Sequence, residues 1–169
     1  VFLGNTLIDM YSNCGNLMDA YRVFDLMVDR GLVSWNAMIR GCSDQGHDLT
    51  ALSLYVKMHE NGIIPSSTTL SIILKACGNM GEMEKAQHIH GEIARMGLLE
   101  TDVFVGTALV DMYVKAGFLA KAQEVFDKLP APNVVSWNAL IGGYAEYGNG
   151  DKAIHLFEKM QLKSISPDA

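Results

Sequence analysis

Small, aromatic and long apolar residues recur along the chain at the spacing of one helical face. A small residue is followed after four positions by a ring-bearing residue, and after three more by a long apolar one. Steps of four and three place all three on the buried stripe of an amphipathic helix. The pattern occurs five times, at Ala20, Phe24 and Met27; Ala51, Tyr55 and Met58; Ala86, His90 and Ile93; Ala122, Phe126 and Leu129; and Ala153, Phe157 and Met160.

A second helix is predicted before each of these, because an apolar run precedes a glycine five residues upstream of each alanine. Glycine ends a helix cheaply in the left-handed conformation, so each glycine predicts a turn between two helices. Ser34 and Ser136 are the predicted N-caps of two of the first helices. The five turn glycines are Gly15, Gly46, Gly81, Gly117 and Gly148.

These helix pairs define five predicted repeats. The residues of "VFLGNTLIDMY" (1–11) and "VSWNAMI" (33–39) return 102 positions later as "VFVGTALVDMY" and "VSWNALI". Stacked helix pairs form a solenoid. The sequence therefore predicts an all-α, right-handed α-solenoid of tandem helix-turn-helix repeats in one domain, without strands. The repeats are 1–31, 32–66, 67–102, 103–133 and 134–168.

Net charge, cysteine spacing and the length of apolar runs limit the classes of function that this chain can have. The net charge of −6 argues against binding nucleic acid through bulk positive charge, so such binding would need a local surface. Cys14, Cys42 and Cys77 form no C-x-x-C pair, which indicates neither a zinc site nor a disulfide framework. No apolar run is long enough to span a membrane. Because the chain opens on Val1, we expect a segment of a longer array without its transit peptide, whose apolar ends favour self-association.

A small polar residue stands at the fifth position of every predicted repeat. Such side chains often cap helices or face solvent. One hydrogen-bonding group per repeat along a groove would also suit reading single-stranded RNA, one base per repeat. Recurrence in all five repeats favours the second interpretation. The residues are Asn5, Asn36, Ser71, Thr107 and Asn138.

The repeats resemble those of the pentatricopeptide repeat (PPR) family, specifically its plant organellar PLS subclass. Tetratricopeptide repeats share the helix pair, but their arrays keep one length. Here the lengths cycle, and the stretch "LVDMYVKAGFLAKAQEVFDKLP" followed by "NVVSWNALIGGYAEYG" is typical of pentatricopeptide repeats. The resemblance covers essentially the whole chain. It implies the order short (S), standard (P), long (L), short (S) and standard (P).

In this family the fifth residue and the last residue of one repeat together select a base. The resemblance implies a pyrimidine for Asn5 with Gly31, cytosine for Asn36 with Ser66, and guanine for Ser71 with Asp102. It implies adenine for Thr107 with Asn133 and uracil for Asn138 with Asp168. The expected RNA footprint is 5′-Y-C-(G)-A-U-3′.

The resemblance also assigns stacking and phosphate contacts. Second residues of the repeats stack against bases, although packing between repeats would explain them equally well. They are Phe2, Val33, Phe104 and Val135, with Thr68 the poorest of the set. The expected phosphate contacts are Arg40 and Lys75, four residues after the fifth position, and Lys115. Asp9, Asp111 and Gly142 interrupt this series, so we expect a modest electrostatic contribution.

The sequence matches known catalytic motifs only in part. His90 and Glu92 match the H-x-E of zinc deaminases, but the required P-C-x-x-C does not follow, since no cysteine lies beyond Cys77. His90 also occupies the core position of its repeat. We expect no catalytic residue, metal or cofactor in this chain.

The combined expectation is a sequence-specific binder of single-stranded organellar RNA in a mitochondrion or chloroplast. It would select sites for C-to-U RNA editing, with any deaminase domain outside this chain. The resemblance further implies that small organellar RNA-editing cofactor proteins bind the long repeat, 67–102. The alternative is a protein-interaction scaffold of tetratricopeptide type, which the acidic charge favours.

Overall fold

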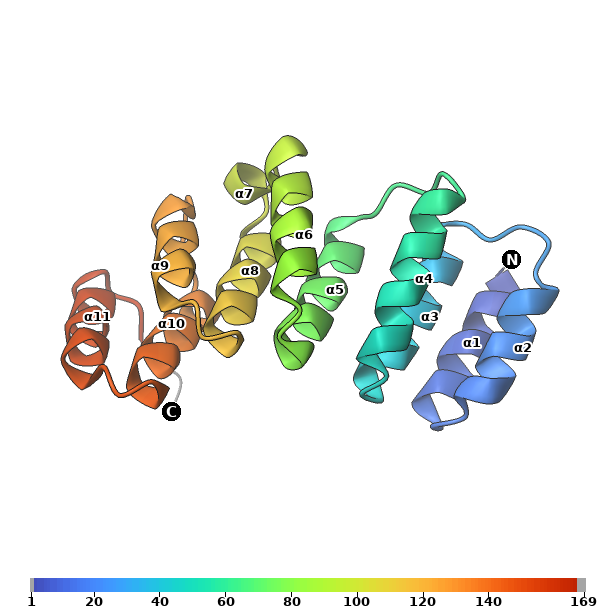
Figure 1. The fold of residues 1–169 in the computed structure, drawn as a ribbon, viewed down its shortest axis with the longest axis horizontal. Helices are drawn as coiled ribbons and strands as arrows, with labels where there is room; N and C mark the ends of the chain where they lie inside the picture. The colour runs from blue at the N-terminus through green and yellow to red at the C-terminus, as the bar shows by residue number, and fades with distance from the viewer. Residues whose placement is uncertain (1, 167–169) are drawn as a thin grey trace. The chain divides into compact units, whose positions relative to one another are not determined.

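The helices follow one another in antiparallel pairs joined by short turns. The computed structural model describes residues 2–166, which contain eleven helices and no strand (Figure 1). The prediction of an all-α chain is therefore confirmed. The helices are α1 (Phe2–Asn13), α2 (Leu17–Leu26), α3 (Leu32–Asp44), α4 (Asp48–Glu60), α5 (Ser67–Met80), α6 (Met83–Arg95), α7 (Leu98–Thr101), α8 (Val103–Lys115), α9 (Leu119–Lys128), α10 (Val134–Glu146) and α11 (Gly150–Leu162).

The turn within each pair depends on a glycine in the left-handed region. Gly15, Gly46, Gly81, Gly117 and Gly148 have φ between +67° and +80°, as predicted. Residues with a Cβ adopt this conformation at a cost of about 1–2 kcal/mol. The glycines therefore end the first helices and reverse the chain.

The helix starts differ from the prediction. Ser34 and Ser136 are not N-caps, because α3 and α10 begin earlier, after Gly31 and Asn133. The Asn133 Oδ1 accepts a hydrogen bond from the Ser136 backbone N–H at 2.9 Å, so the asparagine is the capping side chain. Both serines are fully buried in the first turn of their helices. Their hydroxyls are thus available to other partners.

Differences in repeat length arise after the first helix. The second helices α2 and α9, in the predicted short repeats, have 10 residues, whereas α4, α6 and α11 have 13. In the predicted long repeat, the single-turn helix α7 follows Gly97. The first helices, in contrast, keep 12 to 14 residues. Residues near the start of each first helix therefore have equivalent positions from repeat to repeat.

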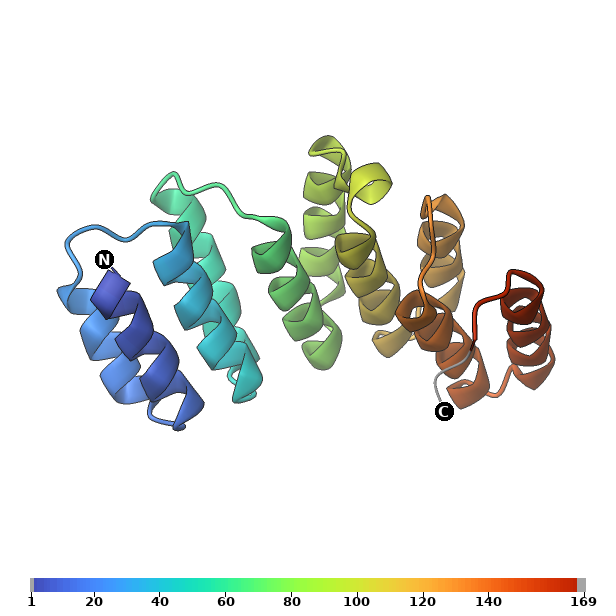
Figure 2. The ribbon, with the colours of Figure 1, turned by 180° about the vertical axis from the view of Figure 1, so that it is seen from behind.

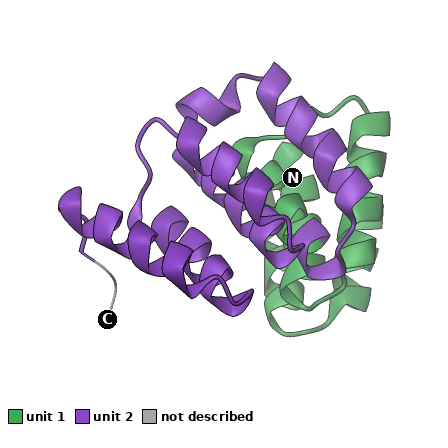
Figure 3. Cartoon of the chain, turned by 60° about the vertical axis from the view of Figure 1, so that its left-hand side comes forward, with its two compact units in different colours: residues 1–76 green, residues 77–169 purple. Residues whose placement is uncertain are grey.

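The chain divides into two compact units, residues 1–76 and 77–169 (Figure 3). In the first unit, α1 packs against α2 and α3, and α3 against α4. In the second, α8 packs against α9 and α10, and α10 against α11. The paired helices lie side by side when seen from the front and from behind (Figures 1 and 2). Within each unit, first helices are therefore neighbours.

The core follows the predicted stripe, except that Phe157 is exposed and Met27 and His90 are half-buried. The five alanines are buried, and Phe24 and Phe126 pack edge-on against Trp35 and Trp137, with ring centroids 4.9 and 4.7 Å apart. Phe157 is 38% exposed, because no helix follows α11 within residues 2–166 to cover it. None of the helices in this range combines the length and apolarity needed to cross a membrane.

Candidate functional site

Apolar side chains at the second position of the predicted repeats extend into solvent. Phe2 and Val33 are 87% and 64% exposed at the starts of the neighbouring helices α1 and α3. Phe104 and Val135 are 74% and 59% exposed on α8 and α10, and Thr68 on α5 is also exposed. This exposure argues against packing between repeats as their role. Exposed flat or branched apolar groups are instead suited to contact with the faces of bases.

The last residues of the predicted repeats sit at the N-termini of the following first helices. The Ser66 Oγ accepts from the Thr69 N–H at 3.3 Å, and the Asp102 Oδ1 accepts from the Phe104 N–H at 2.9 Å. Asn133 caps α10, and Gly31 occupies the same position before α3 without a side chain. These hydrogen bonds fix the last-position side chains. Asp168 lies outside the described residues.

The second repeat brings its two predicted base-reading residues together. The Asn36 Nδ2 donates to the Ser66 Oγ at 3.3 Å, although the residues are 30 positions apart. The amide oxygen Oδ1 accepts from the Thr69 Oγ1 at 2.6 Å. Asn36 is half-buried as a whole residue. Thr69 was not predicted from the sequence, because nothing local marks it as a partner of Asn36.

The first repeat uses a different partner for its fifth residue. Gly31 offers no side chain, and the Ser34 Oγ donates to the Asn5 Oδ1 at 2.7 Å. Ser34 is fully buried on α3. The sequence identified this serine only as a helix cap, which was wrong. The hydrogen bond to Asn5 shows that Ser34 faces α1, the first helix of the preceding repeat.

In the fourth repeat the structure does not join the predicted pair. Thr107 is buried, and its Oγ1 donates to the Val103 carbonyl of its own helix at 2.7 Å. No hydrogen bond within residues 2–166 connects it to Asn133, whose Oδ1 is used as a cap. Asn138 is exposed on α10, and Ser71 is half-buried on α5. Ser71 and Asp102 belong to different compact units.

Two of the three predicted phosphate contacts are already paired with carboxylates. The Lys75 Nζ lies 3.3 Å from the Asp44 Oδ1, and the Lys115 Nζ lies 2.8 Å from the Asp111 Oδ2. Arg40 is exposed and forms no ion pair within residues 2–166. Exposed pairs contribute only about 0–1 kcal/mol, so a phosphate could compete for these lysines.

His90 occupies the predicted core slot of its repeat. Its ring packs edge-on against Tyr113, and its Nδ1 lies 2.8 Å from the Tyr113 hydroxyl. Burial, followed by the charges of Lys128 and Lys121, lowers the pKa of His90 below its ordinary value. Within the described residues, no group of three or more His, Cys, Asp or Glu side chains is arranged to hold a metal ion.

Family comparisons agree with the repeat pattern. The PPR repeat family model matches residues 30–79 and 132–169, and the PPR repeat model matches residues 5–32, 68–98 and 107–131. The chain belongs to the pentatricopeptide repeat family. This assignment separates it from tetratricopeptide repeat proteins.

Two relatives from Arabidopsis thaliana illustrate the similarity. A chloroplastic pentatricopeptide repeat-containing protein is 40% identical over 167 residues, covering 99% of this chain and 24% of that protein. A mitochondrial one is 38% identical over 164 residues, covering 97% of this chain and 26% of that protein. The chain thus spans about a quarter of the length of these relatives.

A solved structure shares the fold. The pentatricopeptide repeat protein PPR10, in complex with an 18-nucleotide psaJ RNA element, matches with a TM-score of 0.83 and 20% identity. The match covers 99% of this chain and 26% of PPR10. At this identity the similarity establishes the fold, which is the helical solenoid of pentatricopeptide repeat proteins.

Proposed function

We propose that this chain binds single-stranded RNA sequence-specifically, with one base per repeat. The observation that carries the proposal is the Asn36–Ser66 hydrogen bond, which joins the fifth and last residues of one repeat. Val33 is exposed at the start of the same helix and can contact the face of a base that the amide reads. The PPR10 structure supports the proposal because that protein shares this fold and is bound to RNA.

Hydrogen-bonding capacity explains how Asn36 would read a base. A carboxamide has two donor hydrogens and two acceptor lone pairs. Asn36 uses one donor toward Ser66 and one acceptor toward Thr69. One donor and one acceptor remain, and they can pair with an acceptor and a donor on the Watson–Crick edge of a base. The family resemblance, with Asn36 at the fifth and Ser66 at the last position, assigns this repeat to a pyrimidine, with cytosine preferred.

The remaining repeats extend this assignment to the footprint 5′-Y-C-(G)-A-U-3′. Phe2, Phe104 and Val135 would stack on bases as Val33 does, and Arg40, Lys75 and Lys115 would contact phosphates. Displacing Asp44 and Asp111 from the two lysines costs little. Because the chain is acidic, base contacts rather than bulk charge would provide most of its preference.

The biological setting that we propose is a plant organelle, in line with the chloroplastic and mitochondrial relatives. The RNA-binding chain would select sites for C-to-U editing, with deamination performed by a domain outside it. The long repeat, residues 67–102, would bind small editing cofactor proteins. The single-turn helix α7 makes this repeat different from its neighbours and offers a distinguishing surface.

Binding of short RNAs tests the base-reading proposal. RNAs carrying UCGAU in a neutral flanking context should bind more tightly than permuted RNAs at one stated salt concentration. Changing both Thr107→Asn and Asn133→Asp should shift the preference at the fourth base from adenine to uracil. Equal binding of the permuted RNAs, or an unchanged fourth-base preference in the double variant, would show that the repeats do not read bases in this way.

A further inference from the structure

Buried hydroxyls lie against the fifth-position asparagines of the first two repeats. The Ser34 Oγ donates to the Asn5 Oδ1 at 2.7 Å, and the Thr69 Oγ1 donates to the Asn36 Oδ1 at 2.6 Å. Each hydroxyl belongs to the third residue of the following repeat in the predicted frame. Both Ser34 and Thr69 have 0% exposure. The same interaction therefore occurs twice at equivalent positions.

Burial makes the direction of these hydrogen bonds important. A buried hydroxyl hydrogen without an acceptor costs about 1–3 kcal/mol. The Thr69 Oγ1 accepts from the Ser66 backbone N–H at 3.0 Å and also lies 3.1 Å from the Ser66 Oγ. Its contact with the Asn36 Oδ1 is shorter, at 2.6 Å, which is the length of an O–H···O hydrogen bond and favours donation to that oxygen. Rotating the amide by 180° would replace this acceptor with an NH₂ group. The hydroxyl thus favours one of the two orientations of the asparagine amide.

The favoured orientation determines what the amide presents to the base. With Oδ1 held by Thr69, the Nδ2 points to the Ser66 Oγ, as observed at 3.3 Å. The remaining donor and acceptor then have a fixed order along the exposed edge of the amide. An amide that is free to flip would present either order and would distinguish bases less well.

We propose that Ser34 and Thr69 are positioning residues for base recognition by Asn5 and Asn36. Base selection by one repeat would then depend on a third-position residue of the next repeat, in addition to its own fifth and last residues. This inference rests on the proposed RNA-binding function. Thr69 is the stronger case, because the repeat on which it would act, 32–66, also contains the Ser66 partner of Asn36.

The chain contains its own control. Ser136 is the counterpart of Ser34 in the later copy of "VSWNA", but the preceding fifth residue is Thr107 instead of asparagine. Here the Ser136 Oγ donates to the Asn133 carbonyl at 2.8 Å. The Thr107 hydroxyl bonds within its own helix. Ser136 is equally buried and has no amide to orient, so removing its hydroxyl should not alter base selection.

The test compares Thr69→Val, Thr69→Ser and Ser136→Ala with the wild-type protein in its natural sequence context. Binding is measured with RNAs that carry each of the four bases at the second or fourth position. Thr69→Val should reduce the second-base preference about five- to tenfold, the loss of roughly one hydrogen bond. Thr69→Ser should keep the preference within about twofold. Ser136→Ala should leave the fourth-base preference unchanged.

A readout without RNA separates this inference from the function on which it rests. The side-chain NH₂ resonances of Asn36 should shift in Thr69→Val and remain near their wild-type positions in Thr69→Ser. A wild-type protein without base preference would overturn the proposed function. Preserved preference in Thr69→Val, or unshifted Asn36 resonances, would overturn the positioning role alone. If Thr69→Val does not fold, the same two measurements are made on Ser34→Ala, with the Asn5 side-chain resonances and the preference at the first base as readouts.

Discussion

Residues 2–64 and 104–166 are two versions of one structural segment, and comparing them shows which features are common to the scaffold and which differ at the surface. Both contain a glycine turn in each hairpin and an edge-on Phe–Trp pair that joins one hairpin to the next. In both, the indole Nε1 of that tryptophan is buried without a hydrogen-bond partner in the described residues. The apolar scaffold is therefore nearly the same, down to a shared unsatisfied donor. The differences lie in polar groups at helix ends and at the candidate RNA surface.

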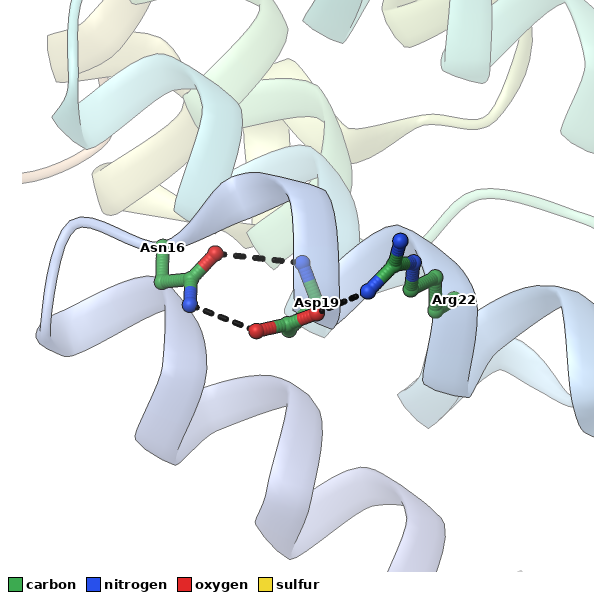
Figure 4. Close-up of polar contacts among 3 residues, drawn as sticks. All are labelled: Asn16, Asp19 and Arg22. Atoms are coloured by element: carbon green, nitrogen blue, oxygen red, sulfur yellow. Dashed lines mark hydrogen bonds and ion pairs between the residues drawn. The ribbon is translucent and has the colours of Figure 1, made fainter.

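One difference is at the start of the second helix of the short repeat. In the first copy, the Asn16 Oδ1 accepts from the Asp19 N–H, while its Nδ2 and Arg22 both donate to the Asp19 carboxylate (Figure 4). In the second copy, Phe118 occupies the N-cap of α9 and makes no side-chain cap hydrogen bond. The second helix of the short repeat therefore forms both with a side-chain cap, in α2, and without one, in α9.

Another difference is at the end of the same helix. The Arg30 guanidinium donates to the carbonyls of Phe24 and Asp25 and lies 4.8 Å from the centroid of the Phe24 ring. Its counterpart is Pro132, which has no donor. A cavity of about 410 Å³ lies there, lined in part by Phe126, Pro132 and Trp137. The second copy therefore lacks the hydrogen bonds that Arg30 makes in the first, and a cavity adjoins the proline at the equivalent position.

The largest expected effect tests the shared scaffold. Trp35→Ala and Trp137→Ala should each lower the free energy of unfolding by about 3–5 kcal/mol, because each removes a buried indole from a close-packed contact. Urea denaturation of both variants measures the loss. Similar losses would support equivalent scaffolds, whereas a loss below about 1 kcal/mol in either copy would contradict the equivalence.

A smaller effect should distinguish the two copies. Gly4 and Gly106 are counterparts, and a Cβ at Gly106 would overlap the buried Leu129 side chain. A Cβ at Gly4 would meet the Met27 Sδ at 2.9 Å, and a methionine adjusts more easily. Gly106→Ala should therefore cost about 1–3 kcal/mol, and Gly4→Ala less. Thermal melts of the two variants measure their losses of stability. A larger loss in Gly4→Ala than in Gly106→Ala would show that overlap of the new Cβ with its neighbour does not determine the loss.

Loss of the α2 cap should have a still smaller effect. Asn16→Ala should lower the free energy of unfolding by about 1 kcal/mol, because it removes the side-chain acceptor of the Asp19 backbone N–H in the first turn of α2. Arg22→Ala is the matched control and should cost less, since Arg22 forms an exposed ion pair. Denaturation of both variants gives the comparison. Equal losses would mean that the exposed ion pair stabilises this helix end as much as the cap does, contrary to the expectation.

The smallest expected effect concerns the repeat between the copies, where His90 replaces the phenylalanine of the core slot. Burial lowers the pKa of His90 in the folded state, so the unfolded state binds its proton more readily. This contribution to stability is complete above the unfolded pKa of about 6.5 and is lost as the pH falls through the lower folded pKa. His90→Phe should reduce the loss of stability between pH 7 and pH 5, measured by urea denaturation. An identical pH dependence in the variant would exclude His90 as its source.

Most of the fold could be predicted because its signals are local. The alanine, ring and apolar positions mark buried helical faces, and the glycines mark turns that other residues adopt at a cost. The exposure of Val33 and Val135 is consistent with the predicted stacking positions. Phe157 shows the limit of this reasoning, because its burial depends on whether another helix covers it.

The pairing of polar groups could not be predicted in the same way. Sequence reasoning made Ser34 a helix cap, whereas the helix begins at Leu32 and turns the serine toward Asn5. It assigned Lys75 to phosphate without detecting Asp44, which lies 31 residues earlier in the chain. These partners come together only when neighbouring helices pack in a particular register.

The sequence by itself therefore determined the helical fold, the glycine turns and the family, because periodicity and glycine conformations act over a few residues. The tertiary structure decided which hydroxyl holds Asn36, which lysines are paired and which helix ends are capped. The contacts of Asn36 with Thr69, of Asn5 with Ser34 and of Lys75 with Asp44 depend on ångström-scale distances between side chains about 30 residues apart, which no local pattern specifies.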